Sequence, residues 1–295
     1  MTIGRVTHQT VQRSTLANLQ ANLQRSAELQ ARMSAGTKIT VPSDDPAGAA
    51  DLLRLRADQR ANVQHQRNAT DGDAWLTTVD SALQESLAIV RKARDLAVRA
   101  GSGAMGAESR EALAAEMEAL GVQLRGQANT QYAGRSVFAG TASGPAFGPA
   151  PAYAHGGATG AAVTRQVGPE TAVRVDSDGA AVFGTGAGSA FALLDDLAAT
   201  IRAGGDLSAG IDGIDARMSA MLREVASVGA RHNQVKSATA GLADEKVTLA
   251  SQLSAIEDVD LAQAVLDLQA QEVAYQGALA ATAKVLQPTL LDFLR

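Results

Sequence analysis

The 295-residue sequence contains no cysteine. This absence excludes disulfide bonds, thiolate metal sites and cysteine nucleophiles. Aromatic residues are also scarce, at 3% of the chain, whereas alanine makes up about a fifth of it. Much of the apolar content is therefore a helix former with little side-chain area to bury, which argues against the deep apolar pocket typical of compact enzymes.

The sequence also lacks a basic excess and a long apolar run. It has 26 basic and 31 acidic residues, for a net charge of −5, whereas proteins that coat nucleic acids carry net positive charge. No segment has the length and apolarity of a membrane span, so we expect no membrane insertion. The first 16 residues are polar, which predicts no cleaved secretory signal. If the chain leaves the cell, it uses an unusual route.

Proline is absent from two long tracts, residues 47–144 and 170–287. Because proline is the strongest helix breaker, both tracts can be helical. Apolar residues in alternating steps of three and four run through residues 75–100 and 214–256. This spacing is typical of long helices packed side by side. A helix over residues 214–256 would extend roughly 65 Å at about 1.5 Å per residue.

The two ends of the chain are predicted to be helical arms that carry opposite charge. Residues 1–46 hold five basic and three acidic residues, and residues 251–295 hold two basic and six acidic residues. Opposite charge favours pairing of the arms with each other or with neighbouring copies. Polar residues interrupt both apolar seams, so neither arm is expected to be stable alone. Two frayed, solvated ends remain an alternative interpretation.

Residues 136–190 interrupt the helical pattern with Gly, Pro and Ala. Valines separated by polar residues at 163–167 and 173–175 predict short strands. Residues 168–169 and 176–179 are predicted to form turns. The sequence therefore predicts a mainly α fold: a long antiparallel helical rod or bundle built from both halves of the chain, with paired terminal helices and a small β-rich inserted domain. The expected domains are the arms (1–45 plus 256–295), the rod (46–135 plus 191–255) and the insert (136–190), which projects from the side of the rod.

Candidate chemistry is sparse. No two of the four histidines have a metal-ligand spacing, so we expect no metal. His232 lies on the heptad seam and is predicted to be a core residue, and His155 is predicted to serve in a turn. No phosphate-binding loop, dinucleotide motif or nucleophile–base set is present, so we predict no cofactor and no enzymatic activity.

Two charged clusters have structural interpretations. Asp44 and Asp45 precede Pro46, which suits the first position of a helix, and acidic side chains stabilise a helix N-terminus. The basic residues Arg91, Lys92 and Arg94 are predicted to form a solvated helix face.

Several segments resemble bacterial flagellins and flagellin-like axial proteins. Residues 29–46, LQARMSAGTKITVPSDDP, are similar to the N-terminal signature of that family, and residues 67–72 and 91–98 continue it. Residues 134–140 and 153–157 resemble the small domain of the hook–filament junction members, and residues 258–295 resemble their C-terminal region. The positions that match the family and that we assign to assembly are Arg32, Ser34, Gly36, Ser43, Asp44, Asp45, Pro46, Phe138, Ala139, Gly140, His155, Gly156, Gly157, Leu290, Leu291, Phe293, Leu294 and Arg295.

The resemblance implies a structural protein of the flagellum that joins hook to filament and templates flagellin assembly. In this family the terminal helices pair in an inner tube, the rod packs outside it and the β domain faces outward. The implied partners are other copies of the chain in a ring, the hook-side junction protein, flagellin and an export chaperone. The family carries an uncleaved N-terminal signal for type III export, which implies secretion to the extracellular flagellum.

Two alternatives stay open. The first is flagellin itself, from which the junction family is separated by residues 138–140 and 155–157. The second is a cytosolic helical scaffold, or an enzyme with a site in residues 136–190. Loss of a substrate-dependent activity in His155→Ala would support an enzyme.

Overall fold

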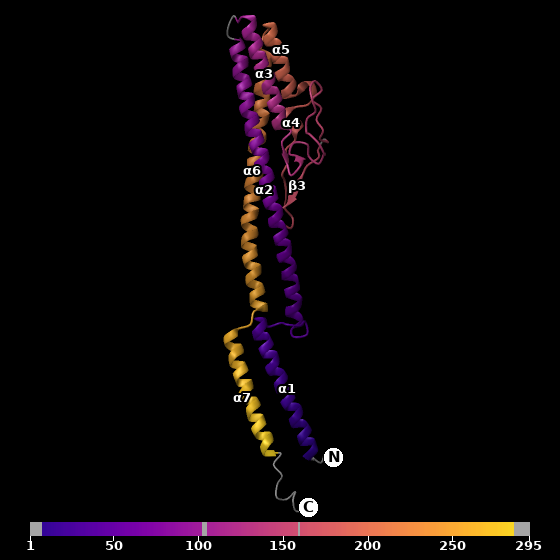
Figure 1. Cartoon of the computed structure of the whole chain (residues 1–295), viewed down its shortest axis with the longest axis vertical. Coiled ribbons are helices and arrows are strands. Elements are labelled where there is room, and N and C mark those ends of the chain that lie inside the picture. Colours follow the sequence, from indigo (N-terminus) through magenta and orange to yellow (C-terminus); the bar gives the residue numbers. More distant parts are fainter. Residues whose placement is uncertain (1–7, 102–104, 159, 286–295) are drawn as a thin grey trace, which may run out of the picture. The chain divides into compact units, whose positions relative to one another are not determined.

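The computed structural model describes residues 8–101, 105–158 and 160–285 (Figure 1). For residues 8, 9, 11, 12, 284 and 285 it describes only the backbone. The chain forms two compact units, one from residues 1–60 with 246–295 and the other from residues 61–245. The boundary falls inside two long helices, α2 (Pro46–Gly101) and α6 (Ser208–Glu257). Both helices therefore contribute to both units.

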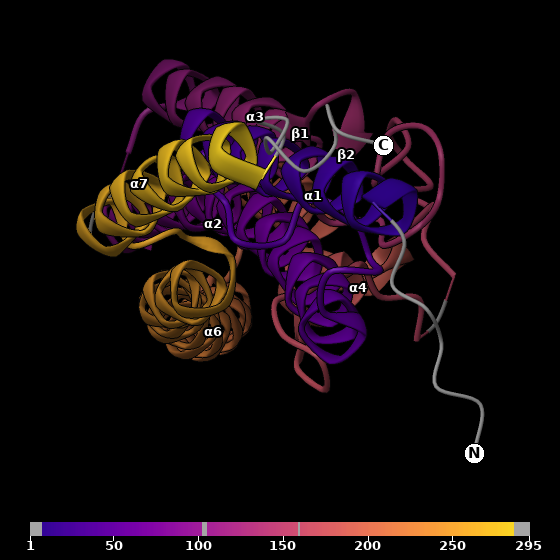
Figure 2. The ribbon, with the colours of Figure 1, turned by 90° about the horizontal axis from the view of Figure 1, so that it is seen from below.

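The first unit contains the terminal helices. Helix α1 (His8–Ala35) and helix α7 (Leu261–Val285) pack against each other, as Figures 1 and 2 show. The predicted pairing of N- and C-terminal helices is confirmed. Two loops complete the unit, residues 36–45 between α1 and α2 and residues 258–260 between α6 and α7.

The second unit is a helical bundle that carries the insert. Helix α3 (Ala107–Ala128) packs on α5 (Ala190–Ala203), beside the long helices α2 and α6. One row of α6 is buried at every seventh residue, which is the spacing that keeps a single face of a helix against its neighbour. The row comprises Ile214, Met221, Val228, Val235 and Leu242. The heptad seam predicted from the sequence is confirmed, and so is the mainly α fold class.

Two small antiparallel sheets are present, the first at the start of the insert and the second within it. Strands β1 (Gln131–Tyr132) and β2 (Arg135–Ser136) form one hairpin, and β3 (Thr164–Gln166) and β4 (Ala172–Arg174) form the other. The first hairpin turns through Ala133 and Gly134, both with positive φ, as its two-residue turn requires. The predicted strands at residues 163–167 and 173–175 are thus confirmed, although the strands are short.

A short helix replaces one predicted turn of the insert. The carboxylate of Asp178 accepts hydrogen bonds from the amides of Ala180 and Ala181. These bonds cap α4 (Gly179–Phe183), so residues 176–179 lead into a helix. A 3-10 turn, η1 (Gly186–Gly188), then leads into α5.

Most of the chain's few aromatic residues gather in one cluster of the insert. Phe147 lies at the centre, with ring centroids 5.7 Å from Phe183 and 5.0 Å from Phe191. Phe138 meets Phe183 edge-on at 5.2 Å. Because Phe191 belongs to α5, this cluster attaches the insert to the helical bundle.

Candidate functional site

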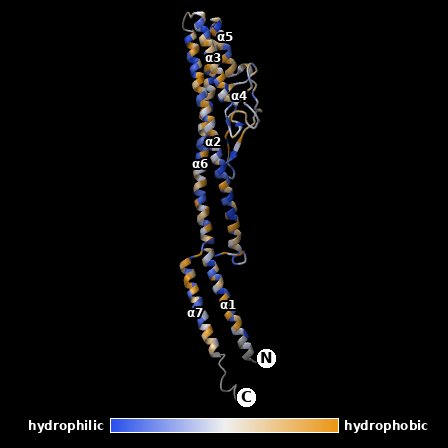
Figure 3. Cartoon of the chain, in the orientation of Figure 1, coloured by the Kyte–Doolittle hydropathy of each residue, from blue (hydrophilic) through white to orange (hydrophobic). Residues whose placement is uncertain are grey.

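Helices α1 and α7 expose large apolar side chains to solvent. On α1, Leu16 is 60% exposed, and on α7, Leu266 and Val273 are 60% and 69% exposed. Figure 3 shows apolar residues recurring along both helices. A solvated helix pair in a self-sufficient fold would turn such residues inward. The pair therefore carries apolar surface that a further packing partner would bury.

Gln271 of α7 makes a polar contact with α1. The side-chain amide of Gln271 donates to both the backbone and side-chain oxygens of Asn22, each at 3.2 Å. In the described parts of α1 and α7, no ion pair joins the two helices. The opposite net charges of the two arms are therefore not neutralised by direct pairing between these helices.

The loops at the inner ends of the two helices pair through their backbones. The Lys38 amide donates to the Glu257 carbonyl at 2.6 Å, and the Val259 amide donates to the Gly36 carbonyl at 3.1 Å. Arg56 adds an ion pair with Glu257 at 2.6 Å. We call residues 36–45 and 257–260 the arm junction.

Gly36 ends α1 in a left-handed conformation. Its φ is +71°, and its amide donates to the Arg32 carbonyl at 2.9 Å. This arrangement is a common helix C-cap, which favours glycine because a Cβ is strained at positive φ. The predicted signature position at Gly36 therefore sets the direction in which the chain leaves α1.

Asp44 closes the loop that follows. One carboxylate oxygen accepts hydrogen bonds from the Thr40 amide at 3.0 Å, the Thr40 hydroxyl at 2.9 Å and the Val41 amide at 3.2 Å. The other oxygen lies 3.7 Å from an Arg32 guanidinium nitrogen. The Thr40 amide, followed by the Thr40 hydroxyl and the Val41 amide, lowers the pKa of Asp44. Asp44 thus shapes the loop, and the prediction that it starts the helix is wrong.

Asp45 performs the helix-capping role. Its carboxylate accepts from the amides of Ala47 and Gly48 at 3.1 and 3.0 Å, and Pro46 is the first residue of α2. This outcome confirms the prediction for Asp45 and Pro46. The remaining signature positions, Ser34 and Ser43, are exposed to solvent.

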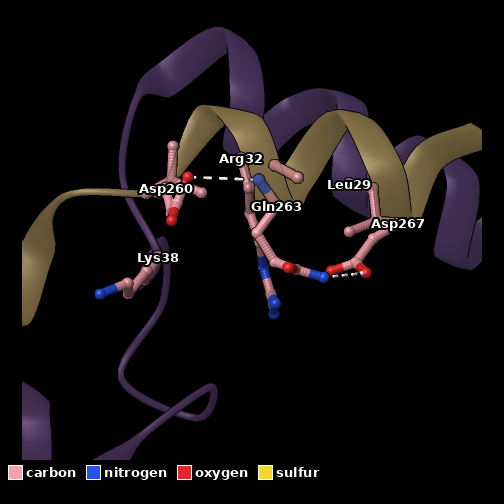
Figure 4. Close-up of a pocket in the computed structure, with 8 residues that line it drawn as sticks. Leu29, Arg32, Lys38, Asp260, Gln263 and Asp267 are labelled. Carbon is pink, nitrogen blue, oxygen red and sulfur yellow. Dashed lines mark hydrogen bonds between the residues drawn. The ribbon is translucent and has the colours of Figure 1, made fainter.

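A cavity of about 180 Å³ lies beside the arm junction (Figure 4). Arg32 of α1 and Lys38 of the following loop line it. Asp260, which precedes α7, and Asp267, which belongs to α7, line it as well. Gln263 donates hydrogen bonds to both carboxylates. Its backbone amide donates to Asp260 at 3.2 Å, and its side-chain amide donates to Asp267 at 2.8 Å. Basic and acidic groups thus face the same small space.

Sequence reasoning missed several residues of this site. Lys38, Arg56 and Glu257 come from a loop, α2 and the end of α6, which are distant in sequence, so no local signal identifies them. Asp260 did have a signal, because an aspartate just before an apolar helical segment is a typical N-cap. Its carboxylate accepts from the Ala262 amide at 2.9 Å.

The structure brings the predicted positions of the insert into one cluster. The His155 ring nitrogen Nε2 lies 3.0 Å from the Phe138 carbonyl oxygen, and the His155 ring lies against Phe147 at 5.0 Å. The histidine therefore closes the loop around the aromatic cluster from a short antiparallel bridge with Phe147, and not from a turn as predicted.

Three glycines of the motif allow close backbone packing in the insert, one of them against His155. A Cβ on Gly157 would lie 2.6 Å from a carbon of the His155 ring and 3.0 Å from the Ala139 oxygen. A Cβ on Gly156 would lie 3.0 Å from the Pro145 carbonyl. Gly140 has positive φ and no room for a Cβ. The motif that resembles the junction family thus forms the tight backbone packing of the insert.

Two predictions for charged residues need correction. His232 is not a core residue: it is half-buried, and its Nε2 lies 2.6 Å from the Asp73 carboxylate on α2. The basic face of α2 is not simply solvated, because Lys92 pairs with Glu116 at 2.9 Å and Arg94 pairs with Asp215 at 2.7 Å. Both corrections arise from partners on other helices.

The predicted positions Leu290, Leu291, Phe293, Leu294 and Arg295 lie outside the described residues. Across the residues that are described, no group of three or more His, Asp or Glu side chains is arranged to hold a metal ion. None of the helices in this part of the chain has the length and apolarity needed to span a membrane. The site thus offers apolar surface and paired loops for packing.

Comparison with known families gives two matches. Residues 6–143 match the bacterial flagellin N-terminal helical region, and residues 211–294 match the bacterial flagellin C-terminal helical region. Together these matches cover about three quarters of the chain.

Individual relatives match over different lengths. The chain is 26% identical to a flagellin of Bacillus subtilis over 99% of this chain and 100% of that protein. It is 31% identical to flagellar hook-associated protein 3 of Salmonella typhimurium over 58% of this chain and 53% of that protein. The chain thus spans about half the length of the second relative, and it spans about a third of several other flagellins.

A solved structure shares the fold. The crystal structure of flagellar hook-associated protein 3 from Legionella pneumophila matches with a TM-score of 0.62 at 14% identity. The match covers 68% of this chain and 98% of that one.

Proposed function

Since the chain belongs to the bacterial flagellin superfamily, we propose that it is the structural protein that joins the flagellar hook to the filament and templates flagellin assembly. The observation that carries this proposal is the fold, whose match covers 98% of a solved hook-associated protein. The 31% identity to flagellar hook-associated protein 3 of Salmonella typhimurium gives independent support.

The exposed apolar side chains of α1 and α7 explain how such a protein works. Leu16, Leu266 and Val273 leave apolar area that a neighbouring subunit can cover, so the helix pair gains stability on assembly. We propose that other copies of this chain form a ring, with the hook-side junction protein on one side and flagellin on the other. An export chaperone would cover the same surface before secretion to the extracellular flagellum.

Flagellin is the alternative function. It is favoured by the Bacillus subtilis flagellin, which matches this chain over its full length. The junction function is favoured by the solved hook-associated structure, because the fold match covers 98% of that chain.

Immunogold labelling of intact cells distinguishes these functions. The antibody is raised against residues 136–190, and a strain that lacks the gene is the control. Gold confined to the boundary between hook and filament is the expected result. Gold along the filament would establish a flagellin, and cells without surface gold would contradict both functions.

A further inference from the structure

The long helices α2 and α6 include a stretch with very little apolar burial. We call α2 residues 61–72 and α6 residues 233–245 the stem; Figure 1 shows α3 and α5 beside the parts of α2 and α6 above it. Within the stem, the buried apolar side chains are Ala69, Val235 and Leu242. A fourth buried residue, Asn62, is polar and donates to the Leu242 carbonyl at 3.1 Å. Direct polar bonds supplement this small core: the Asn62 side chain also donates to the Glu245 carboxylate at 2.8 Å, and the Gln66 side chain donates to the Leu242 carbonyl at 3.2 Å.

The β3–β4 hairpin supplies contacts on the α2 side of the stem. The Gln166 carbonyl at the end of β3 accepts from the Asn68 side chain at 2.9 Å, and His65 Nδ1 lies 3.3 Å from the same oxygen. Arg165 donates to the Asp71 carboxylate at 2.6 Å and stacks over the Trp75 ring at 5.3 Å. These bonds fix the hairpin along α2.

The other end of the same hairpin is fixed to α6. The Arg231 guanidinium donates to the Asp176 carbonyl and to the Glu224 carboxylate, each at 2.5 Å, and Glu224 also accepts from the Ser177 hydroxyl at 2.6 Å. The Asp176 side chain is fully buried and accepts from the Val163 amide at 2.9 Å. A buried carboxylate thus ties both strands of the hairpin together at the point that Arg231 holds.

A glycine in the middle of α2 makes room for this contact. Gly72 is buried, and a Cβ there would lie 3.2 Å from a Val175 methyl and 3.7 Å from Arg165. Glycine inside a helix has a lower helix propensity than alanine, so this residue weakens α2 locally. Gly72 belongs, with Asn68 and Asp71, to the 67–72 segment, so half of that sequence motif contacts the hairpin.

We propose that the β3–β4 hairpin is a clasp that spans α2 and α6 and keeps the stem paired. The insert then has a mechanical role within the subunit, in addition to any role at its outer surface. The role follows from the placement of the two sets of bonds: one set holds α2, the other holds α6, and the hairpin is the covalent link between them.

Hydrogen exchange on the full-length protein tests the clasp from both of its ends. In Arg165→Met and, separately, in Arg231→Met, we expect amides of the stem to exchange about tenfold faster, while α3 amides are unchanged. The matched control is Arg202→Met, which removes ion pairs with Glu111 and Glu118 far from the stem and should leave stem exchange unaltered. Faster exchange confined to the hairpin itself, with a protected stem, would overturn the proposal.

A larger side chain at Gly72 provides a second test that holds even if an arginine variant fails to fold. Gly72→Leu raises the helix propensity of α2, so a stem held by its own helices would exchange more slowly. If the hairpin is a clasp, the leucine displaces it and stem exchange rises by about the same tenfold as in the arginine variants. The two hypotheses thus predict changes of opposite sign, and slower exchange in Gly72→Leu would refute the clasp.

Discussion

Lys38, in the loop after α1, and Glu257, the last residue of α6, are joined by a backbone hydrogen bond of 2.6 Å, although more than 200 residues separate them in the sequence. The neighbouring bond from Val259 to Gly36 makes the contact a short antiparallel bridge. This bridge fixes where α1 ends relative to where α7 begins. The arms therefore have a defined starting point, even though their apolar faces remain exposed.

The first prediction concerns Gly36. Alanine at this position should destabilise the arm unit by about 1–2 kcal/mol, because a Cβ is strained at a φ of +71°. The control is Gly277→Ala in α7, where a Cβ meets nothing within 4 Å. That change should instead stabilise the helix by about 1 kcal/mol. Urea unfolding followed by circular dichroism measures both, and equal effects of the two substitutions would contradict the role of Gly36.

The second prediction is that the Asp44 loop loosens in acid. The pKa of Asp44 is lowered in the folded chain, chiefly by the Thr40 amide, so its hydrogen bonds stabilise the loop fully above the unfolded pKa of about 4. This stabilisation is lost as the pH falls through the folded pKa. The protection of the Thr40 and Val41 amides, taken relative to the intrinsic exchange rate at each pH, should fall over that range, and Asp44→Asn should abolish this change in protection. If these amides stay equally protected in acid, the Asp44 carboxylate does not hold the loop.

The third prediction concerns alkaline pH and the insert. Burial raises the pKa of Tyr153 to about 12, and the hydrogen bond to Asp195 adds to this shift. The unfolded tyrosine ionises near pH 10, so the insert should lose stability as the pH rises from about 10 to 12. Ultraviolet difference absorption follows the ionisation, and urea unfolding follows the stability. Tyr153→Phe should remove this loss of stability at alkaline pH. If the stability of that variant falls with pH as steeply as in the original protein, another group causes the loss.

The fourth prediction separates assembly from folding. Glutamate at Leu266 or Val273, which are 60% and 69% exposed, should change the stability of the monomer by less than about 0.5 kcal/mol. The same charge, buried between subunits, should prevent assembly. Urea unfolding and swimming assays of cells that carry each variant give the two readouts. Leu266→Met keeps an apolar side chain and should preserve motility, whereas swimming cells with Leu266→Glu would show that this face is not used.

The sequence by itself determined the helical part of this protein. Heptad spacing from Ile214 to Leu242 depends only on the period of the helix, and the Asp45–Pro46 cap depends only on residues adjacent in the chain. Both were therefore predictable, as were the strands bracketing Gly168. These features share one physical reason: each is fixed by interactions within a few turns of backbone.

Only the tertiary structure decided the partners of the charged and polar residues. His232 bonds Asp73, Arg94 bonds Asp215 and Lys38 meets Glu257 because distant helices and loops come together at one register. The period of each helix is local, but the pairing of two helices depends on packing along their whole length. The contact of Gly72 with the hairpin has the same origin. A glycine inside a helix does not by itself reveal which distant segment packs against it.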